Sequence, residues 1–327
     1  MASNKKIKGV VKYLLLLALA AVLVYFAFRK VEWSAFVGGL KQTRWVWVVF
    51  FCIASVVALV FRTIRWKELI LPFDSDIKSI KVWDAVNVGN LVSLVLPGSG
   101  EFLRCGYVAS KKFEYDKSLG TMFCERLWDA IAIVVLTATS LIYESKRLGD
   151  YFSESILAPV SGRSTVFWLI ALAIVLLAAF VLLAFKLRAR NLFFSRVADS
   201  LTRLWSGFTA YKKSDNKLMI AVSTFVIWLM YVLMCYCIIK ALPATAHLNF
   251  MDAMFLSAIG NFASIIPVPG GIGAYHYLVA TALILYDVSW DMGILFATLN
   301  HEIHAVLIAI VGLFAYLHWV RERKLTD

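Results

Sequence analysis

The chain has 327 residues, of which 61% are hydrophobic and only 17% are charged, and its formal net charge is +12. A soluble globular domain is about 45–50% apolar and about 25% charged, so this composition excludes an ordinary soluble protein. The positive charge does not indicate nucleic-acid binding, because basic cytoplasmic loops that face anionic lipid produce the same excess. The five cysteines lie in or beside apolar runs, and their spacing forms neither a disulfide framework nor a zinc motif.

Six apolar runs are candidates to cross a bilayer, which takes about 20 mostly apolar residues. In chain order they are Val10–Phe28, Trp45–Phe61, Leu127–Tyr143, Val166–Phe185, Leu218–Ile239 and Met292–Trp319. The basic N-terminus is similar to a signal peptide, but apolar residues continue through Phe28, so we expect an uncleaved anchor. The sequence therefore predicts an all-α, polytopic integral membrane protein with a single domain over residues 1–327.

Two further apolar segments, Ala85–Pro97 and Ala253–Ile266, are too short to cross a bilayer comfortably. Each is followed by a Pro-Gly break, the first at Gly98 and the second at Gly270, and then by another short arm. Segments of this kind are typical of broken helices that enter and leave a membrane on the same side. We therefore expect two re-entrant hairpins in addition to the six spans.

The two broken segments are also similar to each other in sequence. The matching positions are Asp84-Ala85, Gly89-Asn90 and Ser93 in the first segment, and Asp252-Ala253, Gly260-Asn261 and Ser264 in the second. A repeat of short, Pro/Gly-broken apolar segments points to a transporter binding site. The alternative is a chance likeness between two apolar helices that both contain glycine.

The distribution of Lys and Arg predicts the orientation of the chain. Basic residues are concentrated in Arg62–Lys81, Arg104–Lys117, Lys186–Lys217 and Arg321–Lys324, and Arg29–Arg44 is the one basic loop that disagrees. The positive-inside rule places both termini in the cytoplasm and the protein in the cytoplasmic membrane. The two hairpins would then enter from opposite sides and form an inverted repeat whose tips meet near the midplane.

Residues 192–209, within the longest basic loop, carry apolar side chains at helical spacing with basic residues between them. This pattern predicts an amphipathic helix that lies in the membrane interface and contacts anionic lipids.

Ionisable residues cluster after the first break. Glu101 and Arg104 lie one helical turn apart, Glu125 and Asp129 share a helix face, and Arg126 is placed to pair with Asp129. Ionisable groups inside an apolar run are costly, and they are functional candidates by default. Because guanidinium binds phosphate through two hydrogen bonds, Arg104 and Arg126 are the candidates for contact with a phosphate headgroup, oriented by the three carboxylates. An ion pair that only joins two helices is the alternative.

A histidine cluster marks the second half of the chain. His276 follows the second break, whereas Asn300, His301, Glu302 and His304 lie inside the last apolar span. So many polar residues in an apolar run predict a cluster that titrates or contacts substrate. A metal site is the alternative, although the spacing is not that of the His-Glu-x-x-His zinc motif.

Glycines at the tips of the two breaks add a backbone contribution to this candidate site. They are Gly98 in the first break and Gly270, Gly271 and Gly273 in the second. Because glycine has no side chain, it would let backbone amide groups approach a headgroup closely.

Three motifs, taken in order, resemble the transmembrane region of the lysylphosphatidylglycerol synthases. They are Gly-Glu-Phe-Leu-Arg at 100–104, Glu-Arg-Leu-Trp-Asp at 125–129 and Pro-Val-Pro-Gly-Gly-Ile-Gly at 267–273. The resemblance extends from about Ala20 to Tyr316 and implies a lipid-translocating domain, which some members fuse to a soluble aminoacyl transferase. This chain has no such domain before its end at Asp327, so by resemblance it would move a lipid rather than make one. It departs from the family at His276, where Glu is usual, and at His301, where Arg is usual.

The sequence therefore predicts that the protein flips an anionic phospholipid or a polyprenyl-phosphate-linked lipid between leaflets. We expect the lipid's phosphate headgroup to be the ligand, and we expect no cofactor, no metal ion and no nucleic-acid partner. The alternative is a membrane-embedded, lipid-modifying enzyme with a His/Glu acid–base or metal site, although no nucleophile or transferase motif indicates one. A non-transporting scaffold would leave the charges inside apolar runs unexplained.

Overall fold

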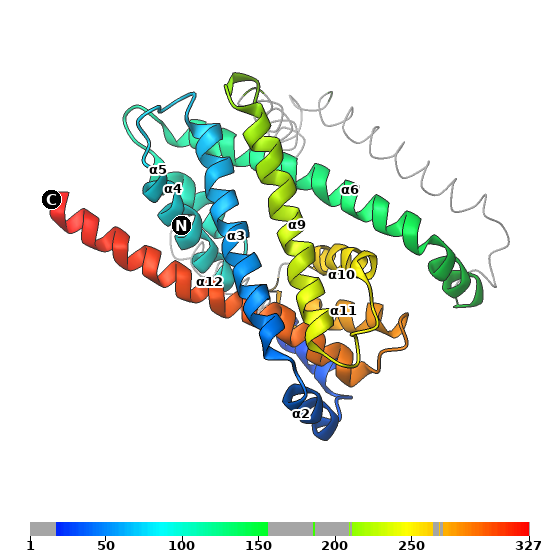
Figure 1. Ribbon diagram of the computed structural model, residues 1–327. Coiled ribbons are helices and arrows are strands. Elements are labelled where there is room, and N and C mark those ends of the chain that lie inside the picture. Colours follow the sequence, from blue (N-terminus) through cyan, green and yellow to red (C-terminus); the bar gives the residue numbers. More distant parts are fainter. Residues whose placement is uncertain are drawn as a thin grey trace.

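The computed structural model describes residues 18–155, 186, 209, 211–263, 268 and 271–326, and within these residues every regular element is a helix (Figure 1). The helices are Ala18–Phe28, α2 (Trp33–Lys41), α3 (Trp45–Ile70), α4 (Ser79–Val95), α5 (Ser99–Val108), α6 (Tyr115–Ser155), α9 (Lys217–Ala241), α10 (Phe250–Ala263), α11 (Ala274–Ile284) and α12 (Trp290–Thr326). The all-α prediction is confirmed there. The predicted span Val166–Phe185, the interfacial helix at 192–209 apart from Thr209, and Gly270 lie outside the described residues.

Four helices are long and apolar enough to cross a membrane, namely Trp45–Ile70, Tyr115–Glu144, Lys217–Ala241 and Trp290–Glu322. Each contains one of the predicted spans. The first predicted span, Val10–Phe28, is described only from Ala18 onward, as a shorter apolar helix. These helices are those of a multi-pass membrane protein, because each provides the length that a bilayer crossing needs.

The predicted end of the second span at Phe61 is wrong. α3 continues through Arg62 and Arg65 to Ile70, so both arginines belong to a membrane-length helix and not to the basic loop that charge counting assigned them to. The helix continues because the guanidinium groups have carboxylate partners on neighbouring helices, which offsets the cost of removing the charges from water. α6 likewise begins before its predicted span, at Tyr115.

The apolar core joins the helices of both halves of the chain. α3 and α9 run side by side over much of their length, and α10, α11 and α12 pack against their lower part (Figure 1). Phe51, Ile238, Leu283 and Phe296 are fully buried there. Because lipid is as apolar as these side chains, their close packing and not their transfer from water favours the contact, and this cluster joins residues of both halves of the chain.

Both predicted breaks separate two short helices that pack on each other, α4 with α5 and α10 with α11. The matching glycines of the repeat have the same role in each pair. A Cβ on Gly89 would lie 2.8 Å from the carbonyl oxygen of Gly100 in α5, and one on Gly260 would lie 2.6 Å from the ring of Tyr275 in α11. Glycine therefore allows the second arm to approach the first in both pairs. That these pairs enter the membrane as re-entrant hairpins stays a prediction.

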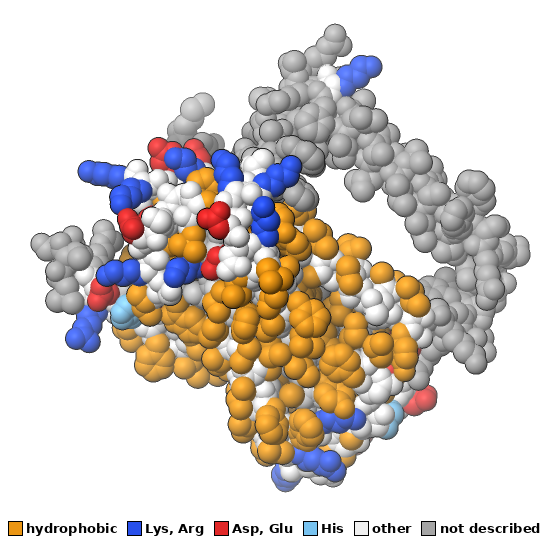
Figure 2. Space-filling view, turned by 45° about the horizontal axis from the view of Figure 1, so that its top comes forward, with side chains coloured by type: hydrophobic (Ala, Val, Ile, Leu, Met, Phe, Trp, Pro, Cys, Tyr) orange, Lys and Arg blue, Asp and Glu red, His pale blue; other side chains and the backbone are white. Residues whose placement is uncertain are grey.

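A broad apolar face covers the middle of the molecule (Figure 2). Val134, Ile142, Phe225 and Phe314 each leave two thirds or more of the side chain exposed, at 66%, 75%, 68% and 68%. Side chains of both charges gather at one end of this face, and a smaller patch of Lys and Arg lies at the opposite end (Figure 2). Exposed apolar area of this extent marks contact with lipid, because soluble proteins rarely expose it.

Candidate functional site

Charged residues from α3, α5 and α6 meet in one ion-pair network. It contains four arginines, Arg62, Arg65, Arg104 and Arg126, and three carboxylates, Glu101, Glu125 and Asp129. With every group in its ordinary charge state, four positive charges face three negative charges, and the network keeps one net positive charge. The predicted Arg126–Asp129 pair is confirmed at 3.3 Å, and Glu101 and Arg104, one helical turn apart, also pair at 2.6 Å.

Arg65 and Arg104 form the buried part of this network. Arg65 lies 2.8 Å from Asp129 and 3.4 Å from Glu125, and its side chain is fully buried. Nη2 of Arg104 lies 2.6 Å from both Glu101 and Glu125. Two carboxylates surround each of these guanidinium groups, so the pair joins α3, α5 and α6. Neither arginine lines the cavity described below, although Nη2 of Arg65 and Nη1 of Arg104 have no hydrogen-bond partner in the described structure.

Arg62 and Arg126 form the open part of the network. Their side chains are 15% and 37% exposed, and each lies more than 3.5 Å from Glu101, at 3.8 Å and 3.7 Å. Nε and Nη2 of Arg126 have no hydrogen-bond partner within the described structure, although Nη2 is 3.3 Å from Asp129. Arg126 is therefore the most exposed arginine of the network.

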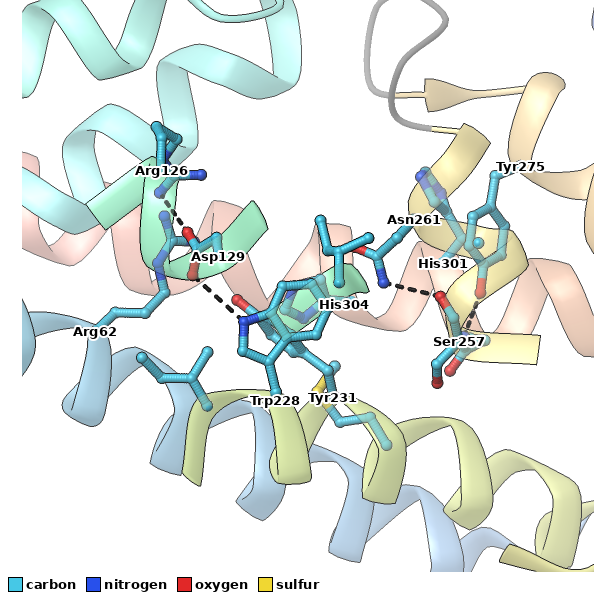
Figure 3. A pocket seen from close by; sticks show the side chains of 15 residues that line it. Arg62, Arg126, Asp129, Trp228, Tyr231, Ser257, Asn261, Tyr275, His301 and His304 are labelled. Carbon is cyan, nitrogen blue, oxygen red and sulfur yellow. Dashed lines mark hydrogen bonds and ion pairs between the residues drawn. The ribbon is translucent and has the colours of Figure 1, made fainter. Parts of the chain in front are cut away.

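These two arginines line a cavity of about 330 Å³, which we call the polar chamber (Figure 3). Its lining comes from α3, α6, α9, α10, α11 and α12 and consists of Arg62, Arg126, Asp129, Ile133, Ile227, Trp228, Tyr231, Met234, Ser257, Gly260, Asn261, Tyr275, Asn300, His301 and His304. A volume near 300 Å³ is at the lower end for ligand sites and suits a small polar group.

The chamber has two chemically different walls. Figure 3 shows Arg62, Arg126 and Asp129 on one side, and Asn261 and Tyr275 on the other. The first wall carries the charges. The second wall carries neutral hydrogen-bonding groups, so the two walls are placed to contact different parts of one ligand.

Two of the three histidines of the cluster line the chamber, and the third does not. His301 and His304 line the chamber, and Nδ1 of His304 lies 3.0 Å from the hydroxyl of Ser55. Nδ1 of His301 lies 2.9 Å from Glu302, and Nε2 of His276 lies 3.7 Å from the same carboxylate. His276 is only 2% exposed and does not line the chamber, but it contacts His301 and Glu302.

Five of the predicted site residues line the chamber, namely Arg126, Asp129, Asn300, His301 and His304. The other described candidates do not line it: Gly98, Glu101, Arg104, Glu125, Gly271, Gly273, His276 and Glu302. Gly98 is exposed at the first break, and Gly271 lies behind His301, where a Cβ would be 3.4 Å from Nε2.

Arg104 is the predicted phosphate ligand that the structure places differently. It is 2% exposed, its guanidinium stacks on the Trp66 ring at 4.2 Å, and it is paired with two carboxylates. Arg104 therefore faces carboxylates and not the chamber, which Arg62 lines in its place. Among the described residues, no three His, Cys, Asp or Glu side chains are gathered to hold a metal ion.

The sequence prediction missed Arg62, Trp228, Tyr231, Ser257 and Tyr275 on the chamber wall. Arg62 was counted as a loop residue, although its spacing of three from Arg65 places both on one helix face. Trp228 and Tyr231 have the same spacing on α9, but aromatic residues in an apolar run ordinarily pack or face lipid. Only the packing of α9, α10 and α11 brings these side chains to one space.

A second cavity, of about 460 Å³, lies on the other side of Trp228, and we call it the apolar groove. Trp228 lines both cavities. The groove has no charged residue among its lining, which is Trp128, Ile131, Ala132, Val135, Leu136, Thr139, Ala221, Thr224, Phe225, Trp228, Leu229, Val232, Phe250 and Met254. A polar space and an apolar space therefore adjoin across one indole ring.

A family model described as the lysylphosphatidylglycerol synthase TM region matches residues 13–312. No curated protein and no solved structure gives a significant match to the chain. The match includes every residue of the ion-pair network and of the polar chamber, and it is consistent with a membrane function that involves lipids. Because the match covers most of the sequence, the chain belongs to the family of the lysylphosphatidylglycerol synthase transmembrane region.

Proposed function

We propose that the protein moves a lipid with a phosphate-bearing headgroup between the two leaflets of a membrane. The substrate class is an anionic phospholipid or a polyprenyl-phosphate-linked lipid. The headgroup would occupy the polar chamber, with its phosphate against Arg62 and Arg126. The protein would act as a transporter and leave the lipid chemically unchanged.

The observation that carries this proposal is the exposure of Arg126 on the chamber wall. Its side chain is 37% exposed and lines the chamber, and the network behind it has one positive charge more than its carboxylates neutralise. A guanidinium group in this state is well suited to a phosphate, whose oxygens accept two parallel hydrogen bonds. An anion would complete the charge balance that the protein leaves open.

The apolar groove supports a lipid over a free anion. It adjoins the chamber at Trp228, so a ligand with a polar end and a hydrocarbon chain could occupy both spaces at once. Thr139 and Thr224 are the hydroxyl-bearing residues of the groove, and Thr224 accepts a hydrogen bond from Arg65 at 3.2 Å. The other residues of the groove are apolar, so the surface of the groove is suited to contact with the hydrocarbon chain of a lipid.

We further propose that the protein lies in the cytoplasmic membrane with both termini in the cytoplasm. Because α3 includes Arg62, Arg65 and Lys67, the basic segment Arg62–Lys81 loses three of its charges to the helix. Lys78 and Lys81 remain outside α3, and Lys112 lies close to them. The positive-inside rule then favours the same orientation. In this orientation, α4–α5 and α10–α11 would form an inverted repeat with one arm pair entering from each side.

Purified protein in unilamellar vesicles tests the proposed function. The substrate is phosphatidylglycerol with a fluorescent label on its acyl chain. Dithionite reduces and quenches this label only in the outer leaflet. Lipid movement that depends on the protein therefore appears as loss of the fluorescence that the inner leaflet otherwise protects. We expect movement with unchanged lipid by mass spectrometry. A new lipid product would support the lipid-modifying enzyme instead, and neither movement nor product would leave the proposal without support.

Three arginine variants make this test specific to the chamber. Arg126→Ala should lower the rate at least about tenfold, because a charge-assisted hydrogen bond contributes about 1.5–3 kcal/mol. Arg126→Lys should restore the charge but not the two parallel hydrogen bonds, and so give an intermediate rate. Arg321→Ala is the matched control, because Arg321 is exposed at the far end of α12. Equal rates for all three variants would contradict phosphate binding at Arg126.

A further inference from the structure

We infer that a groove between α4, α5 and α12 binds the acyl chain of a membrane lipid other than the one proposed for the polar chamber. This groove, which we call the α12 groove, has a volume of about 590 Å³. It shares no lining residue with the polar chamber or with the apolar groove. The inference therefore concerns a second lipid site, and it goes beyond the proposed function.

The α12 groove exists because α12 packs closely on α4 but makes little contact with α5. Gly312 allows the close approach, since a Cβ there would lie 2.7 Å from Cβ of Leu91 in α4. On the α5 side the lining includes Gly106, where a Cβ would meet nothing nearer than the ring of Tyr115, at 3.8 Å. An unbranched hydrocarbon chain can enter a space left by an absent side chain. A whole helix of a second copy, about 10–12 Å wide, cannot.

The lining of the α12 groove is suited to hydrocarbon. The hydroxyl of Tyr107 is turned to Asp84, at 3.4 Å, and most of the other lining residues are aliphatic. Leu103, Leu313 and Tyr316 are 42%, 52% and 41% exposed, so the groove opens on the outer surface of a membrane-length helix. Water would gain few hydrogen bonds in such a space, whereas an acyl chain from the surrounding bilayer would fill it with favourable contacts.

One end of the α12 groove has the character of a membrane–water interface. The ring of Trp319 lies 5.1 Å from the ring of Tyr107 and 5.9 Å from that of Tyr316. Trp and Tyr are enriched at this level of a membrane. Next to these rings, Nδ1 of His318 lies 2.6 Å from Oδ2 of Asp84. A bound lipid would therefore have its polar end at the aromatic rings and its acyl chain along the rest of the groove. In the proposed orientation it belongs to the cytoplasmic leaflet, because α12 ends on that side.

Photolabelling of the full chain in vesicles tests this inference. The probe is phosphatidylglycerol with a photoreactive diazirine on its acyl chain, and mass spectrometry of the digested protein locates the adducts. Gly106→Leu should lower labelling at Leu313 at least about fivefold relative to labelling at Ile142, because the new side chain and an acyl chain cannot occupy the same volume. Gly106→Ala fills less of the groove and should have an intermediate effect. Ile142 is 75% exposed and lines neither groove, so it reports contact with bulk lipid.

Gly38→Leu is the matched control. It makes the same substitution in α2, away from the α12 groove, and nothing lies within 4 Å of the new Cβ. Leucine favours a helix more than glycine does, so both leucine variants should fold. Gly38→Leu should leave labelling at Leu313 unchanged. An equal ratio of the two labels in Gly38→Leu and Gly106→Leu would overturn the inference.

Native mass spectrometry separates a retained lipid from transient contact with the bilayer. After transfer to detergent, the unsubstituted protein and Gly38→Leu should each keep one phosphatidylglycerol molecule more than Gly106→Leu keeps. Loss of a dimer in Gly106→Leu without loss of a retained lipid would assign the groove to a second copy and overturn the inference. Both measurements are independent of lipid movement, so this inference and the proposed function fail separately.

Discussion

The indole nitrogen of Trp228 lies 3.4 Å from Oδ1 of Asp129, and the same Trp228 side chain lines the apolar groove. One residue therefore contacts the ion-pair network on one side and apolar lining on the other. This relationship places a polar space and an apolar space directly against each other, as a ligand with a headgroup and a hydrocarbon chain requires.

Replacing Trp228 with Phe keeps a ring between the two cavities but removes the hydrogen bond to Asp129. Lipid movement should fall about tenfold, because a hydrogen bond to a charged group contributes about 1.5 kcal/mol or more. The vesicle assay measures the rate, and Trp45→Phe is the control because the Trp45 side chain is 55% exposed at the start of α3. An equal effect of the two substitutions would show that the Trp228–Asp129 contact is unimportant.

Arg65 and Arg126 should differ in their effects on stability, although both pair with Asp129. Arg65→Ala should cost about 3–5 kcal/mol, because it removes the fully buried partner of Asp129 and leaves the buried Glu125 with Arg104 alone. Arg126→Ala should cost about 0–1 kcal/mol, because Arg126 is 37% exposed and Asp129 keeps Arg65. Thermal unfolding in detergent measures both variants, and equal losses of stability would contradict this division.

The two chamber histidines, His301 and His304, should contribute to binding of the headgroup, because both line the chamber. The double variant His301→Gln/His304→Gln should lower the rate of lipid movement in the vesicle assay, whereas His247→Gln, at an exposed position, should not. A chelator should change nothing. An unchanged rate in the double variant would leave both histidines as structural contacts between helices.

The close approach of α4 and α5 predicts different outcomes for two Gly→Ala substitutions. Gly100→Ala should destabilise the protein by about 1–3 kcal/mol, because the new methyl group would overlap the Gly89 carbonyl and force the two backbones apart. Gly120→Ala should be neutral or stabilise α6 by up to about 1 kcal/mol, because nothing lies within 4 Å of the new Cβ. Thermal unfolding compares the two variants, and equal behaviour would mean that the α4–α5 contact is looser than described.

Labelling of single cysteines tests the proposed orientation. In intact cells, an impermeant maleimide should fail to label Lys112→Cys but should label His247→Cys, because these exposed positions lie on opposite sides of the membrane in the proposed topology. Both should label after the cells are opened. The unsubstituted protein provides the background, since Cys52 is half-buried and the other cysteines are buried. Labelling of both positions from outside would exclude the inverted repeat.

The amino-acid sequence by itself determined the class of protein, four of the membrane-length helices and the positions of the two breaks. These features are local: a run of apolar residues, a Pro-Gly pair or a charge spacing of three or four can be read without knowing what packs nearby. The same local spacing correctly predicted the Arg126–Asp129 pair. It also placed His301 and His304 on one helix face, and both line the chamber.

Only the tertiary structure decided which charges are buried and which line the chamber. Arg104 and Arg126 are equivalent in the sequence, since each lies three residues from a carboxylate, but Arg104 is 2% exposed between Glu101 and Glu125, whereas Arg126 is 37% exposed and lines the chamber. The physical reason is that burial and neutralisation depend on partners from other helices. Those partners are set by the packing of α3, α5 and α6, which no pattern within a single segment contains.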